Sequence, residues 1–119
     1  MRSNFALPLA IVLCGLTTVA VAAKSMSPEE IKATFGTGVA FASTSPAGAR
    51  YSLVLKADGT ATRTPRKSKA ATPGTWRLSK DGYCSKWSGG SENCYTVEPD
   101  GTKYTVLDAH GTTAAVWSK

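Results

Sequence analysis

The fold is decided by the stretch "YTVEPDGTKYTVLDAHGTTAAVW", residues 95–117. In it, short runs rich in threonine, valine and aromatic residues alternate with two turn signals, Asp100-Gly101 and His110-Gly111. Glycine adopts the positive φ that tight primed turns require, and Asp-Gly between alternating runs is a strong hairpin signal. We therefore predict antiparallel strands on either side of these two turns.

The same pattern continues toward the N-terminus. The run "RYSLVLKADGTATRT" alternates with period two and turns at Asp58-Gly59, and "TWRLSKDGYCSKW" turns at Asp81-Gly82. Four such turns in the chain predict seven or eight antiparallel strands. The predicted fold class is mostly β, a small antiparallel barrel or a strongly curved sandwich, because closure removes exposed strand edges.

The segment "TPRKSKAATPG", residues 64–74, interrupts this pattern. It contains Pro65 and Pro73 together with several small residues. Proline cannot donate a backbone hydrogen bond to a neighbouring strand. We therefore predict a long loop or a frayed sheet edge here.

One short helix is predicted near the N-terminus, at about residues 27–35. Ser27 is suited to the N-cap position, and Glu30 follows three residues later, which is the pattern of a capping box. A helix of two turns is not stable alone in water. We expect it to dock Ile31 and Phe35 on an apolar surface and to plug or cap one end of the β structure.

Residues 1–22 are predicted to be a cleaved signal peptide, which leaves a single β domain at 23–119. Arg2 precedes a long apolar stretch without charge, and Ala20-Val21-Ala22 fits the small-x-small pattern of a cleavage site. The stretch is also just long enough to be a transmembrane anchor. Its proline and its small residues favour cleavage, so we expect a periplasmic or secreted protein with no stable membrane span.

Cleavage would remove Cys14 and leave two cysteines, Cys84 and Cys94. In an oxidising compartment such a pair is expected to form a disulfide. If the two cysteines face each other in a hairpin, period-two alternation places them on one face and Tyr83, Trp87 and Tyr95 on the other. A redox pair would be spaced more closely, and zinc would need four ligands, so we predict neither a metal site nor a cofactor.

The three aromatic residues of this hairpin, Tyr83, Trp87 and Tyr95, are the predicted binding residues. They could form a wall on which a flat ligand stacks, or they could simply fill the core of a small barrel. Trp87 is the best candidate for exposure, because it lies close to the glycine-rich hairpin tip "SGGSE".

The charge is modest. The chain has 14 Lys and Arg against 8 Asp and Glu, and loss of Arg2 would leave 13 against 8, a net charge of +5. The basic cluster Arg63, Arg66, Lys67 and Lys69 could contact a phosphorylated lipid, an acidic polysaccharide or an acidic protein. The alternative is a solvated loop or a guarded strand edge. No aromatic residue is interleaved with these cations, which argues against nucleic acid as a partner.

The residues give little support to catalysis. The chain has one histidine, His110, in a predicted turn, and Asp108 is close enough in sequence to orient it. No serine or threonine stands out as a nucleophile for this pair. We therefore predict that the protein is not an enzyme.

Residues 74–117 resemble a family of small exported proteins of Gram-negative bacteria that is classed as a domain of unknown function. The helix sequence "SPEEIKATFG" also looks like the opening of that family. The resemblance implies export, a disulfide and a β architecture, and it implies no activity. It is carried by Gly74, Trp76, Tyr83, Cys84, Trp87, Cys94, Tyr95, Gly111 and Trp117.

Two functions are therefore expected. The first is an exported, non-catalytic binding module of the cell envelope, with an unknown ligand at a barrel mouth near Trp87. The second is a proteinaceous inhibitor of a secreted or periplasmic hydrolase. A protease is favoured over lysozyme, because cationic lysozyme would repel a protein of positive charge. An open cavity lined by tryptophans would favour ligand binding, and an ordered N-terminal segment reaching into a protease cleft would favour inhibition.

Overall fold

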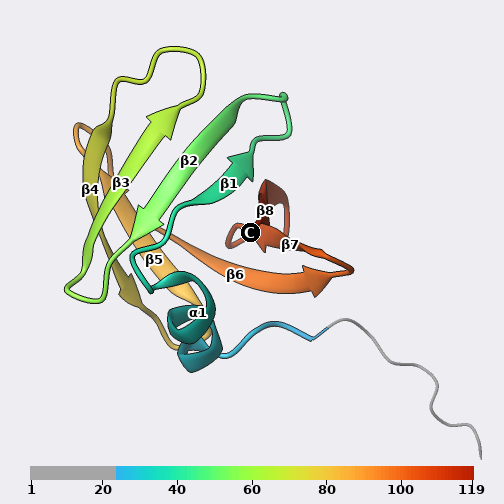
Figure 1. The fold of residues 1–119 in the computed structure, drawn as a ribbon. Helices are drawn as coiled ribbons and strands as arrows, with labels where there is room; N and C mark the ends of the chain where they lie inside the picture. Colours follow the sequence, from blue (N-terminus) through green and yellow to red (C-terminus); the bar gives the residue numbers. More distant parts are fainter. Residues whose placement is uncertain (1–23) are drawn as a thin grey trace, which may run out of the picture.

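The computed structural model describes residues 24–119 and contains one helix and eight strands (Figure 1). The predicted signal peptide therefore lies outside the described residues. The helix precedes all of the strands in the chain. The elements are α1 (Pro28–Phe35), β1 (Phe41–Thr44), β2 (Arg50–Leu55), β3 (Thr60–Pro65), β4 (Thr72–Leu78), β5 (Tyr83–Trp87), β6 (Asn93–Asp100), β7 (Lys103–Leu107) and β8 (Thr113–Ser118).

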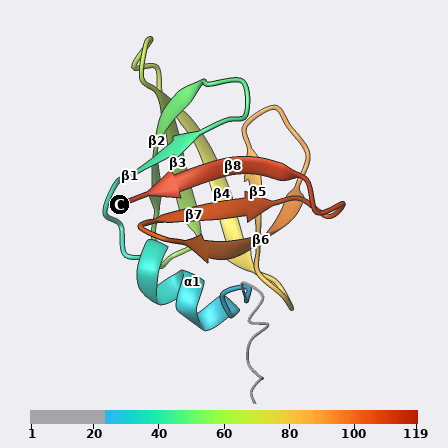
Figure 2. The ribbon, with the colours of Figure 1, turned by 90° about the vertical axis from the view of Figure 1, so that its right-hand side faces the viewer.

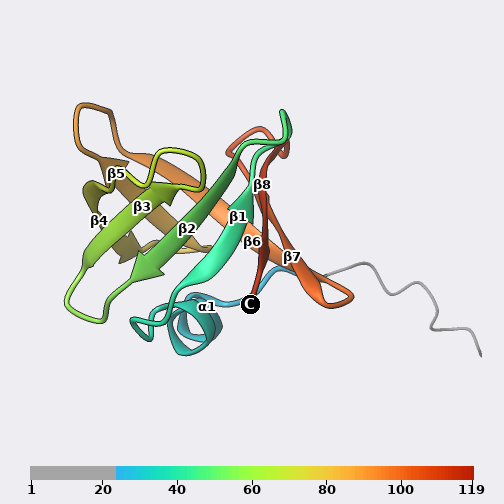
Figure 3. The ribbon, with the colours of Figure 1, turned by 45° about the horizontal axis from the view of Figure 1, so that its top comes forward.

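The strands form a closed barrel in which each strand pairs with its sequence neighbours in antiparallel fashion. The barrel closes where β1 lies beside β8, with Ser43 opposite Trp117 and Thr44 opposite Val116 (Figure 3). The predicted mostly-β class is therefore confirmed, and the barrel rather than the sandwich is the form adopted. Closure leaves no unpaired edge in the sheet.

Three of the hairpins share one five-residue turn, which differs from the predicted primed turn. In Ser45–Ala49, Lys56–Thr60 and Asp108–Thr112, the N–H of the first residue donates to the carbonyl of the fifth. The fourth residue is a glycine with positive φ, at 91° in Gly48 and 78° in Gly111. This is the three-residue loop with a glycine bulge. The predicted turn positions are confirmed, and the predicted primed turn is wrong at three of the four: Asp58-Gly59 and His110-Gly111 form this loop, and Gly82 has no positive φ.

The two remaining predicted turns show two other uses of glycine. Asp100 pairs with Lys103, so this hairpin has the expected two-residue loop, with Gly101 at a φ of 65°. Gly82 also lies in a hairpin turn, but it is not among the glycines with positive φ. A Cβ atom there would collide with the carbonyl oxygen of Tyr95. Glycine is required at position 82 by close backbone approach and not by its conformational freedom.

Residues 64–74 are more ordered than predicted. Thr64 and Pro65 end β3, Thr72–Gly74 begin β4, and only residues 66–71 form a loop. Arg63 pairs with Thr72 and Thr62 pairs with Pro73, so both prolines lie within paired strands. The prediction of a loop is therefore right for residues 66–71, and it is wrong for the two ends of the segment, where Pro65 and Pro73 belong to paired strands. Both prolines lie close to strand ends, where a missing ladder donor is tolerated.

Helix α1 closes one end of the barrel, as expected (Figure 2). The capping box is formed: the Ser27 hydroxyl accepts from the Glu30 amide at 3.1 Å, and the Glu30 carboxylate accepts from the Ser27 amide at 2.8 Å. Ile31 and Phe35 are fully buried against the barrel. Burial of each such side chain contributes about 1.5–3 kcal/mol, which compensates for the low intrinsic stability of a two-turn helix.

The hydrophobic core lies in the half of the barrel next to this helix. The ring centroid of Phe35 is 4.8 Å from those of Phe41, Tyr104 and Trp117. The indole N–H of Trp76 donates to the carbonyl of Lys56 at 2.7 Å, so the polar atom of this buried ring is satisfied. Within residues 24–119, no helix has the length and apolar character needed to cross a membrane.

Candidate functional site

The two ends of the barrel differ in construction. Figures 1 and 2 show α1 across one end, and the opposite end carries only loops. We call these the closed end and the mouth. The closed end is completed by the turns at 56–59, 79–82 and 101–102. The mouth is ringed by the loops at 45–49, 66–71, 88–92 and 108–112.

A cavity of about 230 Å³ lies inside the barrel, between the core and the mouth. Leu55, Val106 and Trp117 contribute its apolar floor, and each of these side chains is almost fully buried. Ser43 and Ser85 add two hydroxyl groups to its walls, on residues with 6% exposure. The lumen is therefore packed at the closed end and hollow toward the mouth.

The three predicted binding residues all line this cavity. Tyr83 is opposite Tyr95 in the β5–β6 ladder, and their ring centroids are 5.3 Å apart. Tyr83 also lies 5.3 Å from the Trp117 ring. Trp87 follows on β5, nearer to the mouth. Tyr83 is buried and contributes to the core, whereas Trp87 and Tyr95 are only partly buried. Both predicted roles therefore apply to this cluster: Tyr83 fills the core, and Trp87 and Tyr95 form part of the cavity wall.

Burial changes the acid–base properties of the two tyrosines. Desolvation raises the pKa of Tyr83 well above its ordinary value, and the neighbouring Tyr95 adds to the effect. Desolvation also raises the pKa of Tyr95, and the nearby Arg63 opposes this shift. Both phenols are therefore neutral at physiological pH and can donate or accept hydrogen bonds inside the cavity.

Trp87 is positioned by the glycine across from it. Gly74 pairs with Trp87 between β4 and β5. A Cβ atom on Gly74 would stand 2.6 Å from the Trp87 ring. The absence of a side chain at position 74 therefore makes room for the indole to lie over the backbone of β4 at the mouth.

Arg63 is the one charged side chain that lines the cavity. Its guanidinium carbon lies 4.8 Å from the ring centroid of Trp87 and 5.5 Å from that of Tyr51. Cation–π attraction to the two rings holds the cation at the mouth. The structure thus divides the predicted basic cluster: Arg63 is partly buried in the barrel, whereas Arg66, Lys67 and Lys69 are exposed on the 66–71 loop.

Three polar side chains of the cavity, those of Arg63, Ser43 and Ser85, form no hydrogen bond or ion pair with other residues of the described chain. Among residues 24–119, the one ion pair joins Arg77 to Glu92, so Arg63 has no carboxylate partner there. None of the side-chain hydrogen bonds in this range involves Arg63, Ser43 or Ser85. Buried polar groups are normally paired with protein, water or a ligand. These three side chains are therefore left for water or another molecule in the lumen.

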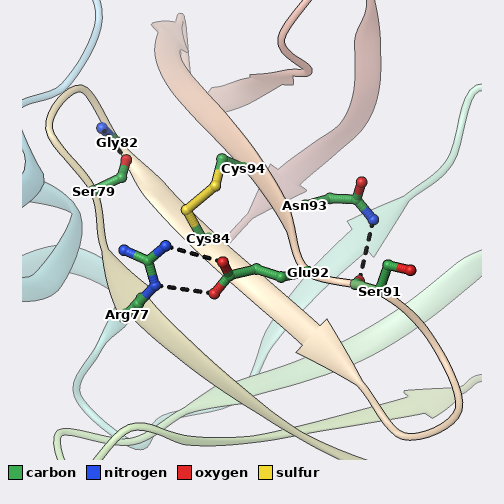
Figure 4. The surroundings of a disulfide bond; sticks show 8 residues. All are labelled: Arg77, Ser79, Gly82, Cys84, Ser91, Glu92, Asn93 and Cys94. Carbon is green, nitrogen blue, oxygen red and sulfur yellow. Dashed lines mark hydrogen bonds and ion pairs between the residues drawn. A yellow bond between two sulfur atoms is a disulfide. The ribbon is translucent and has the colours of Figure 1, made fainter.

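The disulfide lies on the opposite, outer face of the same hairpin. Cys84 and Cys94 are paired in register and joined as predicted. Beside them, Arg77 donates to Glu92 through two hydrogen bonds of 2.9 Å (Figure 4). The bond to Arg77 lowers the pKa of Glu92. The disulfide joins β5 to β6, and the ion pair joins β4 to the 88–92 loop, so both lie outside the barrel and leave the lumen free.

The cluster of Cys84, Glu92 and Cys94 is the only grouping of metal-ligating side chains in the described chain. Its two sulfur atoms are joined to each other, and its carboxylate is engaged by Arg77. Oxidised sulfur is not a thiolate ligand. The arrangement therefore serves as a structural clamp.

Asp108 does not orient the imidazole of His110 in the way a catalytic pair would require. Its carboxylate accepts the backbone amides of His110 at 2.9 Å and Thr112 at 3.0 Å. Both hydrogen bonds lower the pKa of Asp108, and the bond from Thr112 has the larger effect. Asp108 therefore stabilises the five-residue turn at the mouth.

Comparison of the chain with protein-family models, with curated proteins and with solved structures finds no match. The resemblance to exported proteins of unknown function therefore stays a prediction.

Reasoning from the sequence missed three residues of the site, Arg63 as a lumen residue and the serines Ser43 and Ser85. One signal for Arg63 was available, because it is two residues from Ala61 on a strand and so shares its face. A signal for Ser85 was also available, because it lies between Tyr83 and Trp87 on the same alternating face. Nothing in the sequence distinguishes Ser43 from a surface serine.

Proposed function

We propose that this protein is an exported, non-catalytic binding protein of the cell envelope that takes a small organic ligand into the barrel lumen. The observation that carries the proposal is the cavity of about 230 Å³ open at the mouth. An eight-stranded barrel is either filled by its own side chains or left hollow enough for one small ligand. Here the closed half is filled and the mouth half is hollow.

The lining has the composition of a ligand site. Such sites are mainly apolar and aromatic, with a few polar groups that fix orientation. Trp87 and Tyr95 supply partly exposed aromatic faces, and Ser43, Ser85 and Arg63 supply the polar groups. A barrel braced by a disulfide and a capping helix holds these groups in place before the ligand arrives, which lowers the entropic cost of binding.

Export is proposed on two grounds. Residues 1–22 have the pattern of a signal peptide, and the Cys84–Cys94 disulfide is suited to an oxidising compartment.

The inhibitor alternative has less support. It was expected to use an ordered N-terminal segment that projects into a protease. The described start of the chain instead lies on the barrel, because the Met26 amide donates to the Val97 carbonyl at 2.7 Å and the Met26 side chain is buried. This segment is not a free arm.

The test is a binding screen with an occluded variant. The oxidised protein is screened against a panel of small organic molecules by ligand-observed NMR. Ala115 lines the cavity and Val116 is its outward-facing neighbour on β8. Ala115→Phe should abolish binding of the hits by filling the lumen, whereas Val116→Phe, the matched control, should leave it intact.

Two results would contradict the proposal. One is the absence of any hit. The other is a set of hits that bind Ala115→Phe as well as they bind the wild type, which would place them outside the lumen. Formation of a stable complex that slows a secreted protease would favour the inhibitor function instead.

A further inference from the structure

We infer that the lumen is a carboxylate site: its ligand is a small aromatic monocarboxylate whose acid group binds Arg63. This inference rests on the proposed ligand-binding function and names the class of ligand. It follows from the contacts of Arg63, from the engagement of the neighbouring carboxylates, from the distribution of charge and from the size of the cavity.

The first step is the state of Arg63. Its guanidinium carbon lies over the rings of Trp87 and Tyr51, at 4.8 and 5.5 Å from the ring centroids. Stacking on aromatic faces leaves the N–H edges of a guanidinium available. These edges form a planar fork that matches the two oxygens of a carboxylate. The cation is therefore held in place by the aromatic rings, with its hydrogen-bonding edge still to be satisfied.

The second step is that the carboxylates of the mouth are already engaged. The four mouth loops contain two carboxylates, Glu92 and Asp108. Glu92 binds Arg77 on the outside of the barrel. Asp108 accepts two backbone amides in its own turn. Neither group neutralises Arg63, so an acidic ligand would not have to displace a carboxylate of the protein.

The third step is the distribution of charge between the two halves of the barrel. The Arg77–Glu92 pair is neutral. The closed end has six lysines and six carboxylates and is neutral as a whole. The mouth half has six cations against one carboxylate, Asp108, so it holds the entire net charge of the described chain. Those cations are Arg50, Arg63, Arg66, Lys67, Lys69 and Lys86.

This asymmetry directs anions toward the mouth. Charge of one sign around a cleft with low-dielectric walls raises the local concentration of oppositely charged ligands and their association rate. Because Arg66, Lys67 and Lys69 are exposed, salt screens their effect. Arg63 is partly buried and is screened less. The loop cations therefore attract the anion, and Arg63 fixes it.

The last step is the shape of the space that remains. A cavity of about 230 Å³ is smaller than the sites that enclose drug-sized molecules. Its walls include the rings of Tyr83, Tyr95 and Trp117, and aromatic rings pack well against one another in offset or edge-to-face arrangements. A ligand with one aromatic ring would pack against these walls, and a single carboxylate on it would pair with Arg63, the one cation of the lumen.

The experiment compares acids with neutral isosteres. Benzoate and phenylacetate are the probes, and benzamide and benzyl alcohol are the neutral controls, all measured by titration calorimetry on the oxidised protein. We expect the acids to bind about 10- to 100-fold more tightly than the neutral controls, as hydrogen bonds to a charged group allow. Arg63→Gln should remove this preference, whereas Lys67→Gln, a loop cation nearby, should change it by less than about threefold.

A second variant guards against misfolding. Arg63→Met keeps an apolar stem against the aromatic rings and should behave as Arg63→Gln does. The inference is overturned, and the proposed function survives, if the neutral controls bind the wild type as tightly as the acids do, or if the Arg63 variants keep the preference. If neither acids nor neutral compounds bind, the inference is wrong; if the panel screen also yields no hit, the proposed function is wrong as well.

Discussion

A Cβ atom on Gly74 would stand 2.6 Å from the ring of Trp87 and 2.6 Å from the carbonyl oxygen of Lys86. The Trp87 indole at the mouth therefore occupies space that the Cβ atom of any other residue at position 74 would need. An added Cβ would therefore have to displace the ring and also strain the backbone of the barrel wall at Lys86.

Gly74→Ala should therefore displace Trp87 and weaken ligand binding. Forcing a methyl group into a packed site costs about 1–3 kcal/mol, which would appear in denaturant unfolding. Tryptophan emission should shift as the indole leaves its contact with Arg63. Gly90→Ala is the matched control, because its Cβ would be 3.4 Å from the nearest atom. Equal emission spectra for the wild type and Gly74→Ala would show that the ring is not held in this way.

Loss of the disulfide should lower the stability of the barrel. Replacing both Cys84 and Cys94 with serine should lower the free energy of unfolding by about 2.5–3 kcal/mol, from the loop-closure entropy of the unfolded chain. The shift is measured as a change in the urea midpoint. Reductant should lower the midpoint of the wild type and leave that of the double variant unchanged. An unchanged midpoint in both cases would contradict a stabilising role.

Alkaline pH should unfold the protein through Tyr83. Burial raises the pKa of this phenol well above 10.0, so the folded state keeps it protonated when the unfolded state would release the proton. The resulting stabilisation is complete below pH 10 and is lost as the pH rises from there toward the folded pKa. Spectrophotometric titration should show one tyrosine that ionises only with unfolding.

Tyr83→Phe should remove that late ionisation step and make stability less sensitive to alkaline pH. If the late step persists in Tyr83→Phe, another phenol is responsible. Tyr95, whose pKa is also raised, is the next residue to test.

Acid should weaken the turn at 108–112. The amides of Thr112 and His110 lower the pKa of Asp108 below 3.8, so the folded state favours the carboxylate. Its stabilisation is present above pH 3.8 and is lost as the pH falls through the lowered folded pKa. Asp108→Asn should therefore lose less stability than the wild type when urea midpoints are compared at neutral and acidic pH. Parallel pH profiles would rule out this contribution.

The fold was predictable because its determinants are local. Hairpin turns and period-two alternation define adjacent strands, and every pairing except the closing one is between sequence neighbours. The register of Cys84 with Cys94 followed from one hairpin, and it correctly placed Tyr83, Trp87 and Tyr95 on the face away from the disulfide. The turn type was missed at Asp58-Gly59 because Asp-Gly is compatible with two-residue and three-residue loops alike.

The candidate site was only partly predictable, because it depends on contacts between distant strands. Arg63 lies on β3 and Trp87 on β5, with β4 between them, and no short-range pattern brings them together. Because they are close in sequence, Arg63 and Arg66 were predicted as one cluster. In the barrel, Arg63 lines the cavity, whereas Arg66 is exposed on the loop after β3. The role of Gly82 was likewise hidden, because the atom that excludes a side chain there belongs to Tyr95 on another strand.

The pairing of β1 with β8 also has a consequence for how the chain folds. The other seven pairings join neighbours in the sequence and need only short loops to close, so they should form early and fast. Joining Phe41–Thr44 to Thr113–Ser118 closes a loop of most of the domain and carries the largest loop entropy. Until then, β1 and β8 expose edges that can pair with other chains. We expect aggregation during refolding to compete with this last step, and the ligand cavity to exist only after it.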